Sequence, residues 1–424
     1  MLAYNAKICM HLGELSLCVI FYVGMVLIRM GSSSNIHCSE DAQILAMRRL
    51  PELIFGYIEG GTGREICVNN NVASFDLVKL QPRVLENVEH RTTDIKFLNQ
   101  SYSVPFGIAP MGMCNVVHPR SDELLARMAK RYNIPLGLST AASTTLEKVY
   151  SFAPDQVWFQ LYVLPPLEHA LSLVRRAEEA GYKILVLTVD VPQISRRIRD
   201  LRSGFKVDFR FGKRQIYDLA RHPVYSLRML FSGRPKPVHF SLDGEEFNRS
   251  ASRALANWTF LKELRDRWKG KLIIKGVSSI PDALRIKNIG VDAIWVSNHG
   301  GRQLDSAPAT INILPEFRDA LGASYPIILD SGVRSGEDVL KALVCGANFV
   351  MLGRPWLYAL GAEGERGLQS LYDALSFDLS AAMAQIGVCS LNELGTWNLA
   401  SSFRNRVGLN VEESRLRTGR AESG

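Results

Sequence analysis

The stretch PIILDSGVRSGEDVLKALVCGANFVMLGR, residues 326–354, contains the pattern that decides the fold. A short apolar run ends in polar residues, a helical stretch follows, and a second apolar run begins. Runs of this kind recur along the chain at 105–111, 135–140, 157–163, 183–190, 271–277, 292–298, 326–332 and 348–353. Because these runs do not alternate with polar residues, they are typical of parallel strands buried on both faces of a sheet.

The segments between the runs are amphipathic. In LEHALSLVRRAEEAGY, residues 167–182, apolar residues recur at steps of three and four and the pattern stops at Gly181, as a helix does. Eight strand–helix units predict an α/β protein with a single (β/α)8 TIM barrel. An open dinucleotide-binding sheet would require GxGxxG after the first strand, and that motif is absent from the sequence there.

One connection is much longer than the others. The fifth strand run starts nearly ninety residues after the fourth, so we expect a long loop after strand 4, at about 200–255. Basic and apolar side chains are mixed along this segment, between Lys206 and Pro237. The mixture is compatible with an interfacial membrane element, and equally with a lid that packs on the barrel.

The chain ends differ from the barrel region. Residues 1–35 form an N-terminal extension whose apolar segment, 15–28, is shorter than a membrane-spanning helix requires. The extension has three interpretations: an untranslated stretch with Met30 as the true start, a membrane anchor, or an exported leader. We expect the barrel to occupy 36–405 and a C-terminal tail to occupy 406–424.

Composition narrows the classes of partner. A chain of 424 residues with 47% apolar content can bury a full core, and its net charge of +8 suits anionic ligands. The sequence contains no zinc-finger spacing, RNP-like motif or long basic run, so we expect no nucleic-acid partner. Its seven cysteines are scattered without a CxxC pair, which favours reduced thiols in the cytoplasm and neither disulfides nor a metal site.

Polar side chains gather at the predicted strand ends. In a barrel of this kind the active residues lie at the carboxyl ends of the strands. Nearly every predicted strand here ends in a hydrogen-bonding or charged residue, among them Lys275, His299 and Asp330. Strands seven and eight end in glycines with Arg334 and Arg354, which is typical of a phosphate site.

The segment SNHGGRQLD, residues 297–305, makes a family recognisable. It resembles the FMN-dependent 2-hydroxy-acid oxidases and dehydrogenases, a group that includes glycolate oxidase, L-lactate dehydrogenase and L-mandelate dehydrogenase. The resemblance covers about 36–405, and its other motifs are YIEGG (57–61), APMGM (109–113), LSTAAS (138–143), WFQLYV (158–163), LTVDVP (187–192), IKGV (274–277), LDSGVR (329–334) and LGRP (352–355). It implies an FMN cofactor and oxidation of a small L-2-hydroxy acid to the 2-oxo acid.

The resemblance also implies roles for individual residues. His299 would be the base, removing either the α-proton or the hydroxyl proton, and Asp190 would orient its imidazole. Lys275 would lie by the flavin ring, where its charge stabilises the reduced form. The substrate carboxylate would be held by Arg302, Arg197 and Tyr57, with the neighbouring Arg196 as a second candidate for the place of Arg197. Tyr162 would contact the substrate oxygen at C-2. The remaining cofactor contacts would be Pro110, Met111, Gly112, Ser139, Gln160, Thr188, Ser297, Asp330, Ser331, Gly332, Arg334, Gly353 and Arg354.

Two positions bear on substrate and electron acceptor. Ala141 stands where glycolate oxidase carries a tryptophan, which argues for a wider pocket and against glycolate. Gly112 stands where the oxidases tend to have alanine and mandelate dehydrogenase has glycine. The resemblance therefore favours a dehydrogenase for L-lactate or L-mandelate that passes electrons to a quinone or carrier.

Other interpretations stay open at this point. The chain could be an oxygen-using oxidase that makes hydrogen peroxide, or a non-catalytic barrel that binds flavin or phosphate. Because 219–237 is similar to the membrane-binding loop of bacterial lactate and mandelate dehydrogenases, we expect a cytoplasmic protein in peripheral contact with the inner face of the cell membrane. Family members are usually tetramers, so a homo-oligomer is expected by resemblance.

Overall fold

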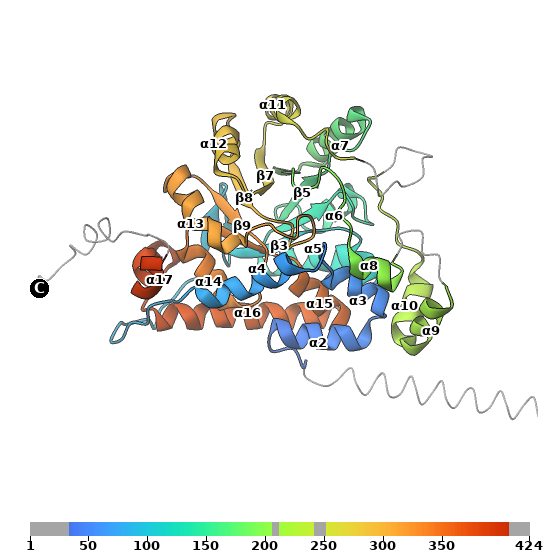
Figure 1. The fold of residues 1–424 in the computed structure, drawn as a ribbon, viewed down its shortest axis with the longest axis horizontal. Helices are drawn as coiled ribbons and strands as arrows, with labels where there is room; N and C mark the ends of the chain where they lie inside the picture. The colour runs from blue at the N-terminus through green and yellow to red at the C-terminus, as the bar shows by residue number, and fades with distance from the viewer. Residues whose placement is uncertain (1–33, 206–211, 241–251, 407–424) are drawn as a thin grey trace, which may run out of the picture. The chain divides into compact units, whose positions relative to one another are not determined.

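The computed structural model describes residues 34–205, 212–240 and 252–406. Eight parallel strands close into a barrel in the order β10-β3-β4-β5-β6-β7-β8-β9 (Figure 1). Their bounds are β3 Phe106–Met111, β4 Leu136–Ser139, β5 Val157–Leu161, β6 Ile184–Thr188, β7 Lys271–Val277, β8 Ala293–Val296, β9 Ile327–Leu329 and β10 Phe349–Leu352. The predicted (β/α)8 TIM barrel is confirmed. Each strand starts within one residue of its predicted run, and polar residues such as Ser297 and Asp330 follow directly after the strands.

Helices surround the barrel and precede it. Gly181 ends α7 in a left-handed conformation with φ of 97°, as the amphipathic pattern predicted. The helices that follow the strands are α5 Ser121–Tyr132, α6 Leu146–Phe152, α7 Leu167–Ala180, α11 Trp258–Arg267, α12 Ile280–Asn288, α13 Thr310–Leu321, α14 Gly336–Val344 and α15 Arg354–Glu363. Outside these units lie α2 Ser39–Arg49, α3 Glu52–Glu59, α4 Ile66–Leu77, α16 Glu365–Gln385 and α17 Ser401–Arg406.

The amino-terminal end of the barrel is filled by aromatic side chains. A hairpin of β1 (Ile95–Phe97) and β2 (Gln100–Tyr102) places Phe97 5.1 Å from Phe349, ring centroid to ring centroid. The hydroxyl of Tyr102 accepts a hydrogen bond from the indole of Trp158 at 3.2 Å. Phe349 and Trp158, which the hairpin contacts, lie at or near the first residues of β10 and β5. The hairpin therefore closes this end of the barrel, and the opposite rim is left for the site.

The long segment after β6 contains more helix than a loop. Its described part forms α8 (Ile198–Ser203), α9 (Lys213–Arg221) and α10 (Pro223–Ser232). Polar contacts tie α9 and α10 to the body of the protein, among them the Tyr225 hydroxyl, which donates to the carbonyl of Val116 at 2.7 Å. Tertiary anchors of this kind let short helices form where the basic and apolar mixture alone gave no clear period.

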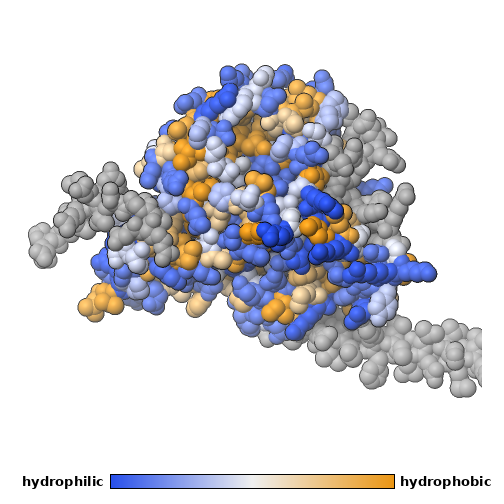
Figure 2. All heavy atoms as spheres, viewed as in Figure 1, coloured by the Kyte–Doolittle hydropathy of each residue, from blue (hydrophilic) through white to orange (hydrophobic). Residues whose placement is uncertain are grey.

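Figure 2 shows hydrophilic residues over most of one face, with apolar residues in small separate groups. Among the described residues, none of the helices has the length and apolarity needed to cross a membrane. The apolar segment predicted at 15–28 lies outside the described residues.

A buried histidine fastens the long segment to the barrel. His239 is 1% exposed, and its Nε2 accepts a hydrogen bond from the backbone N–H of Leu146, the first residue of α6, at 2.9 Å. The neighbouring Val238 N–H donates to the carbonyl of Ala142 at 3.0 Å. Burial and the charge of Arg176 lower the pKa of His239 to about 4, so the ring is neutral at pH 7.

This anchor predicts a pH-dependent contribution to stability. His239→Leu leaves the Leu146 N–H unpaired and should lower the free energy of unfolding by about 1–3 kcal/mol at pH 7. Because the folded-state pKa is depressed, protons bind the unfolded state first as pH falls from about 6.5 to 4, and the contribution is lost over that window. Denaturant titrations at pH 7 and pH 4.5 measure it, with the exposed His90→Leu as control. An equal deficit at both pH values would contradict the assignment.

Candidate active site

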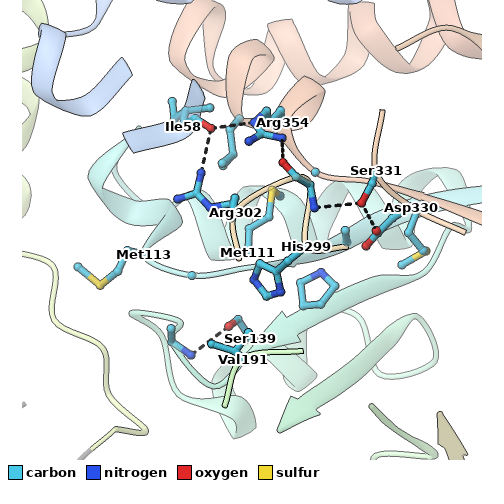
Figure 3. A pocket seen from close by; sticks show the side chains of 18 of the residues that line it. Ile58, Met111, Met113, Ser139, Val191, His299, Arg302, Asp330, Ser331 and Arg354 are labelled. Carbon is cyan, nitrogen blue, oxygen red and sulfur yellow. Dashed lines mark hydrogen bonds between the residues drawn. The ribbon is translucent and has the colours of Figure 1, made fainter. Parts of the chain in front are cut away.

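A pocket opens at the carboxyl ends of the strands, where the predicted site residues converge (Figure 3). Four of the predicted residues, Asp190, Gln160, Thr188 and Ser297, lie directly behind its surface. The pocket lining includes Tyr57, Pro110, Met111, Gly112, Ser139, Tyr162, Arg197, Lys275, His299, Arg302, Asp330, Ser331, Gly332, Arg334, Gly353 and Arg354. The fold therefore brings together side chains that are up to about three hundred residues apart in the chain.

His299 and Asp190 form a pair beside the pocket. Nδ1 of His299 lies 3.0 Å from Oδ1 of Asp190, and the two side chains are 20% and 11% exposed. Burial, together with the charges of Lys275 and Arg197, lowers the pKa of His299 although Asp190 opposes this. Burial would raise the pKa of the Asp190 carboxyl, but His299 and Lys275 outweigh it and hold that pKa below its usual value. The geometry suits a neutral imidazole whose Nδ1 proton is donated to a carboxylate.

The other nitrogen of His299 faces a tyrosine. Nε2 lies 3.4 Å from the hydroxyl of Tyr162, whose burial raises the pKa of its phenol. The ring of Tyr162 also packs edge-on against Phe240 and under the guanidinium of Arg253, which is 5.1 Å from its centroid. Tyr162 therefore places a protonated hydroxyl next to Nε2, the ring nitrogen of His299 that Asp190 does not contact.

Three further predicted residues meet on the α3 side. The hydroxyl of Tyr57 donates to the carbonyl of Gly112 at 2.8 Å, and its ring stacks on Phe205. The guanidinium of Arg302 lies 5.3 Å from the Tyr57 centroid, and its Nη1 donates to the carbonyls of Tyr57 at 3.0 Å and Gly60 at 2.7 Å. These contacts hold Arg302 in a fixed orientation.

The structure distinguishes two neighbouring arginines. Arg197 lines the pocket, with its side chain 11% exposed and 4.0 Å from a carboxylate oxygen of Asp200. Arg196 is exposed and is absent from the described lining of the pocket. Arg197, the residue that the resemblance implied, is therefore the one in a position to reach a ligand.

Lys275 is buried at the end of β7. Its ammonium donates to Oγ of Ser297 at 2.8 Å and lies 3.1 Å from Oδ2 of Asp330. Oδ1 of Asp330 in turn accepts from the Ser331 hydroxyl at 2.7 Å. This chain of contacts connects the ends of strands β7, β8 and β9.

Positive charge accumulates at the ends of β9 and β10. Figure 3 shows Arg302 and Arg354 donating to the same carbonyl oxygen, that of Ile58, at 3.3 and 3.1 Å. Burial, reinforced by Arg302 and Arg334, lowers the pKa of Arg354 to about 10. Gly332 has φ of 102°, and a Cβ there would lie 2.1 Å from the carbonyl oxygen of Asn71. The arginines thus lie near a stretch of backbone that has room only for glycine at position 332. Such an arrangement is suited to a phosphate group.

The residues present fit FMN. Nε2 of Gln160 and Oγ1 of Thr188 are buried without a hydrogen-bond partner among the described residues, which is unusual for groups of this kind. Both sit at carboxyl ends of strands beside Ser139 and Lys275. A flavin ring offers the acceptors and donors that such groups lack, while the arginines at the other end match its phosphate.

Several residues of the pocket lining went unrecognised in the sequence, and two of them come from the long segment. Phe240 and Arg253, which belong to the long segment, line the pocket, and Arg253 is 6% exposed. They lie outside the strand ends that guided the prediction and outside the family motifs. The one available signal in the sequence was the mixture of basic and apolar residues, and it ends at Pro237, before Phe240 and Arg253.

Ala141, expected to widen the pocket, and Gly112, expected to bear on the electron acceptor, lie side by side. A Cβ added to Gly112 would stand 2.8 Å from the Cβ of Ala141, and both residues line the pocket. The wall here has almost no side-chain volume, and a larger residue at either position would have to displace the other. No group of three or more metal-ligating side chains occurs within the described ranges.

A family model and the similar known proteins point to the same group of enzymes. The FMN-dependent dehydrogenase family matches residues 46–401. Over 369 residues the chain is 36% identical to (S)-mandelate dehydrogenase of Pseudomonas putida, covering 85% of this chain and 93% of that protein. It is 34% identical over 375 residues to L-lactate dehydrogenase of Pseudomonas syringae pv. syringae strain B728a, covering 85% and 97%.

Solved structures resemble the fold closely. The monotopic membrane protein (S)-mandelate dehydrogenase superposes with a TM-score of 0.82 at 35% identity, covering 87% of this chain and 100% of that chain. A mandelate oxidase variant in complex with (S)-mandelic acid superposes with a TM-score of 0.74 at 31% identity, covering 86% and 98%.

His299→Asn tests the imidazole directly. His299 has φ of 57°, a left-handed conformation that asparagine tolerates well, so the loop should keep its shape. Loss of the base should reduce kcat/KM for a 2-hydroxy acid by about 10²–10⁴-fold. FMN binding, followed by its absorption spectrum, should persist because the cofactor contacts are intact. Undiminished turnover would exclude His299 as the base, and no turnover in either protein would favour a non-catalytic binding barrel.

Proposed function

Because this chain belongs to the FMN-dependent dehydrogenase family, and is an FMN-dependent 2-hydroxy-acid dehydrogenase, we propose that it oxidises a small L-2-hydroxy acid of the lactate or mandelate type to the 2-oxo acid. Bound FMN supplies the acceptor for the two electrons that leave the substrate. The protein's own task is to bind the acid, orient it and remove a proton.

The His299–Asp190 pair carries this proposal. Asp190 accepts a hydrogen bond from Nδ1–H of His299, and the lone pair of Nε2 is then free to take a proton from the substrate. The lowered pKa of His299 keeps the ring neutral and competent at pH 7. Once the ring is protonated, the carboxylate of Asp190 stabilises its charge.

The arginines and tyrosines would bind and orient the acid. Arg197 and Arg302 lie on the pocket surface, where a guanidinium can form paired hydrogen bonds with a carboxylate. Tyr57 would donate its hydroxyl proton to the same carboxylate by turning it away from the carbonyl of Gly112. Tyr162, 3.4 Å from His299, would contact the oxygen at C-2 and so bring the proton to be removed toward Nε2.

The absence of side-chain volume at Gly112 and Ala141 favours acids larger than glycolate. The relatives named above act, by their names, on (S)-mandelate and L-lactate, which differ in the size of the substituent at C-2. We propose a substrate within that range.

The first test is anaerobic. L-lactate, L-mandelate and glycolate are added in turn to the FMN-loaded protein while flavin absorbance is followed. One of the first two should bleach the flavin, and glycolate should react at least about tenfold more slowly because it leaves the space beside Ala141 unfilled. Bound FMN that no 2-hydroxy acid bleaches would contradict the proposed reaction.

We further propose that electrons pass to a quinone or another carrier. The named dehydrogenases among the relatives support this, whereas the similar mandelate oxidase makes an oxygen-using enzyme the competing candidate. Reoxidation of the bleached protein by a quinone analogue should outpace reoxidation by air-saturated buffer. Fast peroxide formation would support the oxidase instead.

Helices α9 and α10 present the features of a peripheral membrane contact. Apolar side chains there are strongly exposed: Phe231 86%, Leu230 74%, Tyr217 66%, Ile216 58% and Leu227 49%. The exposed arginines Arg221 and Arg228 lie among them. Apolar side chains beside cations match an anionic lipid surface, and a similar solved structure is described as monotopic. We propose that this helix pair docks on the inner face of the cell membrane. A homotetramer stays a prediction from the resemblance.

Replacing two of these side chains tests the contact. The double variant Leu230→Ser and Phe231→Ser should bind vesicles containing anionic lipid at least about tenfold more weakly, because each apolar side chain loses transfer energy. Sedimentation of the full-length protein with vesicles measures this. The control is Phe377→Ser, which is 73% exposed on α16. Equal binding by the double variant and the control would contradict the assignment.

A further inference from the structure

The cation predicted to face the flavin lies against a tryptophan inside the barrel. Lys275 and Trp295 are register partners on the adjacent strands β7 and β8. The Lys275 ammonium lies 5.2 Å from the centroid of the Trp295 ring, and the two residues are 4% and 0% exposed. A cation at this distance over an indole face is attracted by the ring quadrupole, and more strongly when both groups are removed from water.

Trp295 does not reach the ligand surface itself. Lys275 lines the pocket, whereas Trp295 is absent from its described lining and belongs to the apolar cluster inside the barrel. Its indole Nε1 has no hydrogen-bond partner among the described residues, so no polar contact accounts for its orientation. Trp295 therefore acts on the site only through what it touches.

The contacts around the ammonium leave one direction open. Ser297 Oγ accepts one hydrogen bond at 2.8 Å and Asp330 Oδ2 lies 3.1 Å away. An ammonium has three donors, and the indole face borders it on a further side. Because Lys275 also lines the pocket, the remaining donor is available to a ligand there, where the resemblance implies the flavin ring.

We infer that Trp295 is a positioning residue which holds the Lys275 ammonium toward the flavin and thereby makes bound FMN easier to reduce. The inference rests on the proposed function and on the role beside the flavin ring that the resemblance implies for Lys275. Without the aromatic face of Trp295, the Lys275 side chain can rotate, and its charge is then less concentrated at the flavin ring. Since that charge favours the reduced, anionic cofactor, the midpoint potential should become more negative.

The experiment compares three barrel-interior variants of the FMN-loaded, full-length protein. Trp295→Met keeps an apolar side chain but removes the π-face, and Trp295→Phe keeps a smaller π-face. The matched control is Trp158→Phe, which is 1% exposed in the same apolar cluster and donates to Tyr102. Midpoint potentials are measured against reference dyes, and melting temperatures are recorded in parallel.

Trp295→Met should shift the equilibrium toward oxidised FMN by about two- to thirtyfold, the range of a cation–π attraction. Trp295→Phe should lie between Trp295→Met and the wild type, and Trp158→Phe should match the wild type in potential. Melting temperatures should fall in all three, because each loses packed volume. If Trp295→Met does not fold, a shift in Trp295→Phe that Trp158→Phe lacks still supports the inference.

Two outcomes would overturn it. Potentials that stay at the wild-type value in the Trp295 variants, with only the melting temperature lowered, would make Trp295 a packing residue. Lys275→Met, measured at saturating FMN, separates this failure from that of the proposed function. If Lys275→Met shifts the potential and Trp295→Met does not, only the present inference fails. If neither shifts it, the role proposed for Lys275 fails as well.

Discussion

Closure of the eight-stranded parallel barrel is the constraint on which the site depends. Parallel strands all end at the same rim, so residues that follow the strands must converge there whatever their distance in sequence. His299 follows β8 and Asp190 follows β6, yet their side chains meet at 3.0 Å. The aromatic plug of the β1–β2 hairpin closes the other end, so the polar groups can be buried at one rim without interrupting the core.

Concentrated positive charge at this rim has two consequences. Cations around Arg354 and Lys275 are costly to bury, and that cost is offset when anionic groups bind among them. Burial, with smaller contributions from the charges of Lys275 and Arg197, lowers the pKa of His299 and so keeps the imidazole neutral. The cations of this rim would thus serve the cofactor and substrate binding proposed above, and the carboxylates of Asp190 and Asp330 lie beside His299 and Lys275.

The long segment after β6 links this chemistry to the surface. Its helices α9 and α10 expose the apolar and basic side chains proposed to meet the membrane. Farther along the same segment, Phe240 and Arg253 pack around Tyr162 in the pocket, and His239 anchors the chain between these two regions. The proposed docking surface and part of the pocket lining are therefore contributed by the same long segment, and the buried hydrogen bond of His239 lies between them.

Sequence alone determined the barrel, because unbroken apolar runs at regular spacing have few other solutions, and it located every predicted site residue at or behind the rim. Those residues follow strands, where topology dictates their position. Tertiary structure decided what local pattern cannot encode. It selected Arg197 over Arg196 by burial, turned part of the expected loop into α8, α9 and α10, and brought Arg253 under the Tyr162 ring. It also placed Trp295 against Lys275. The register between β7 and β8 sets this contact, and the periodicity of a sequence does not predict register.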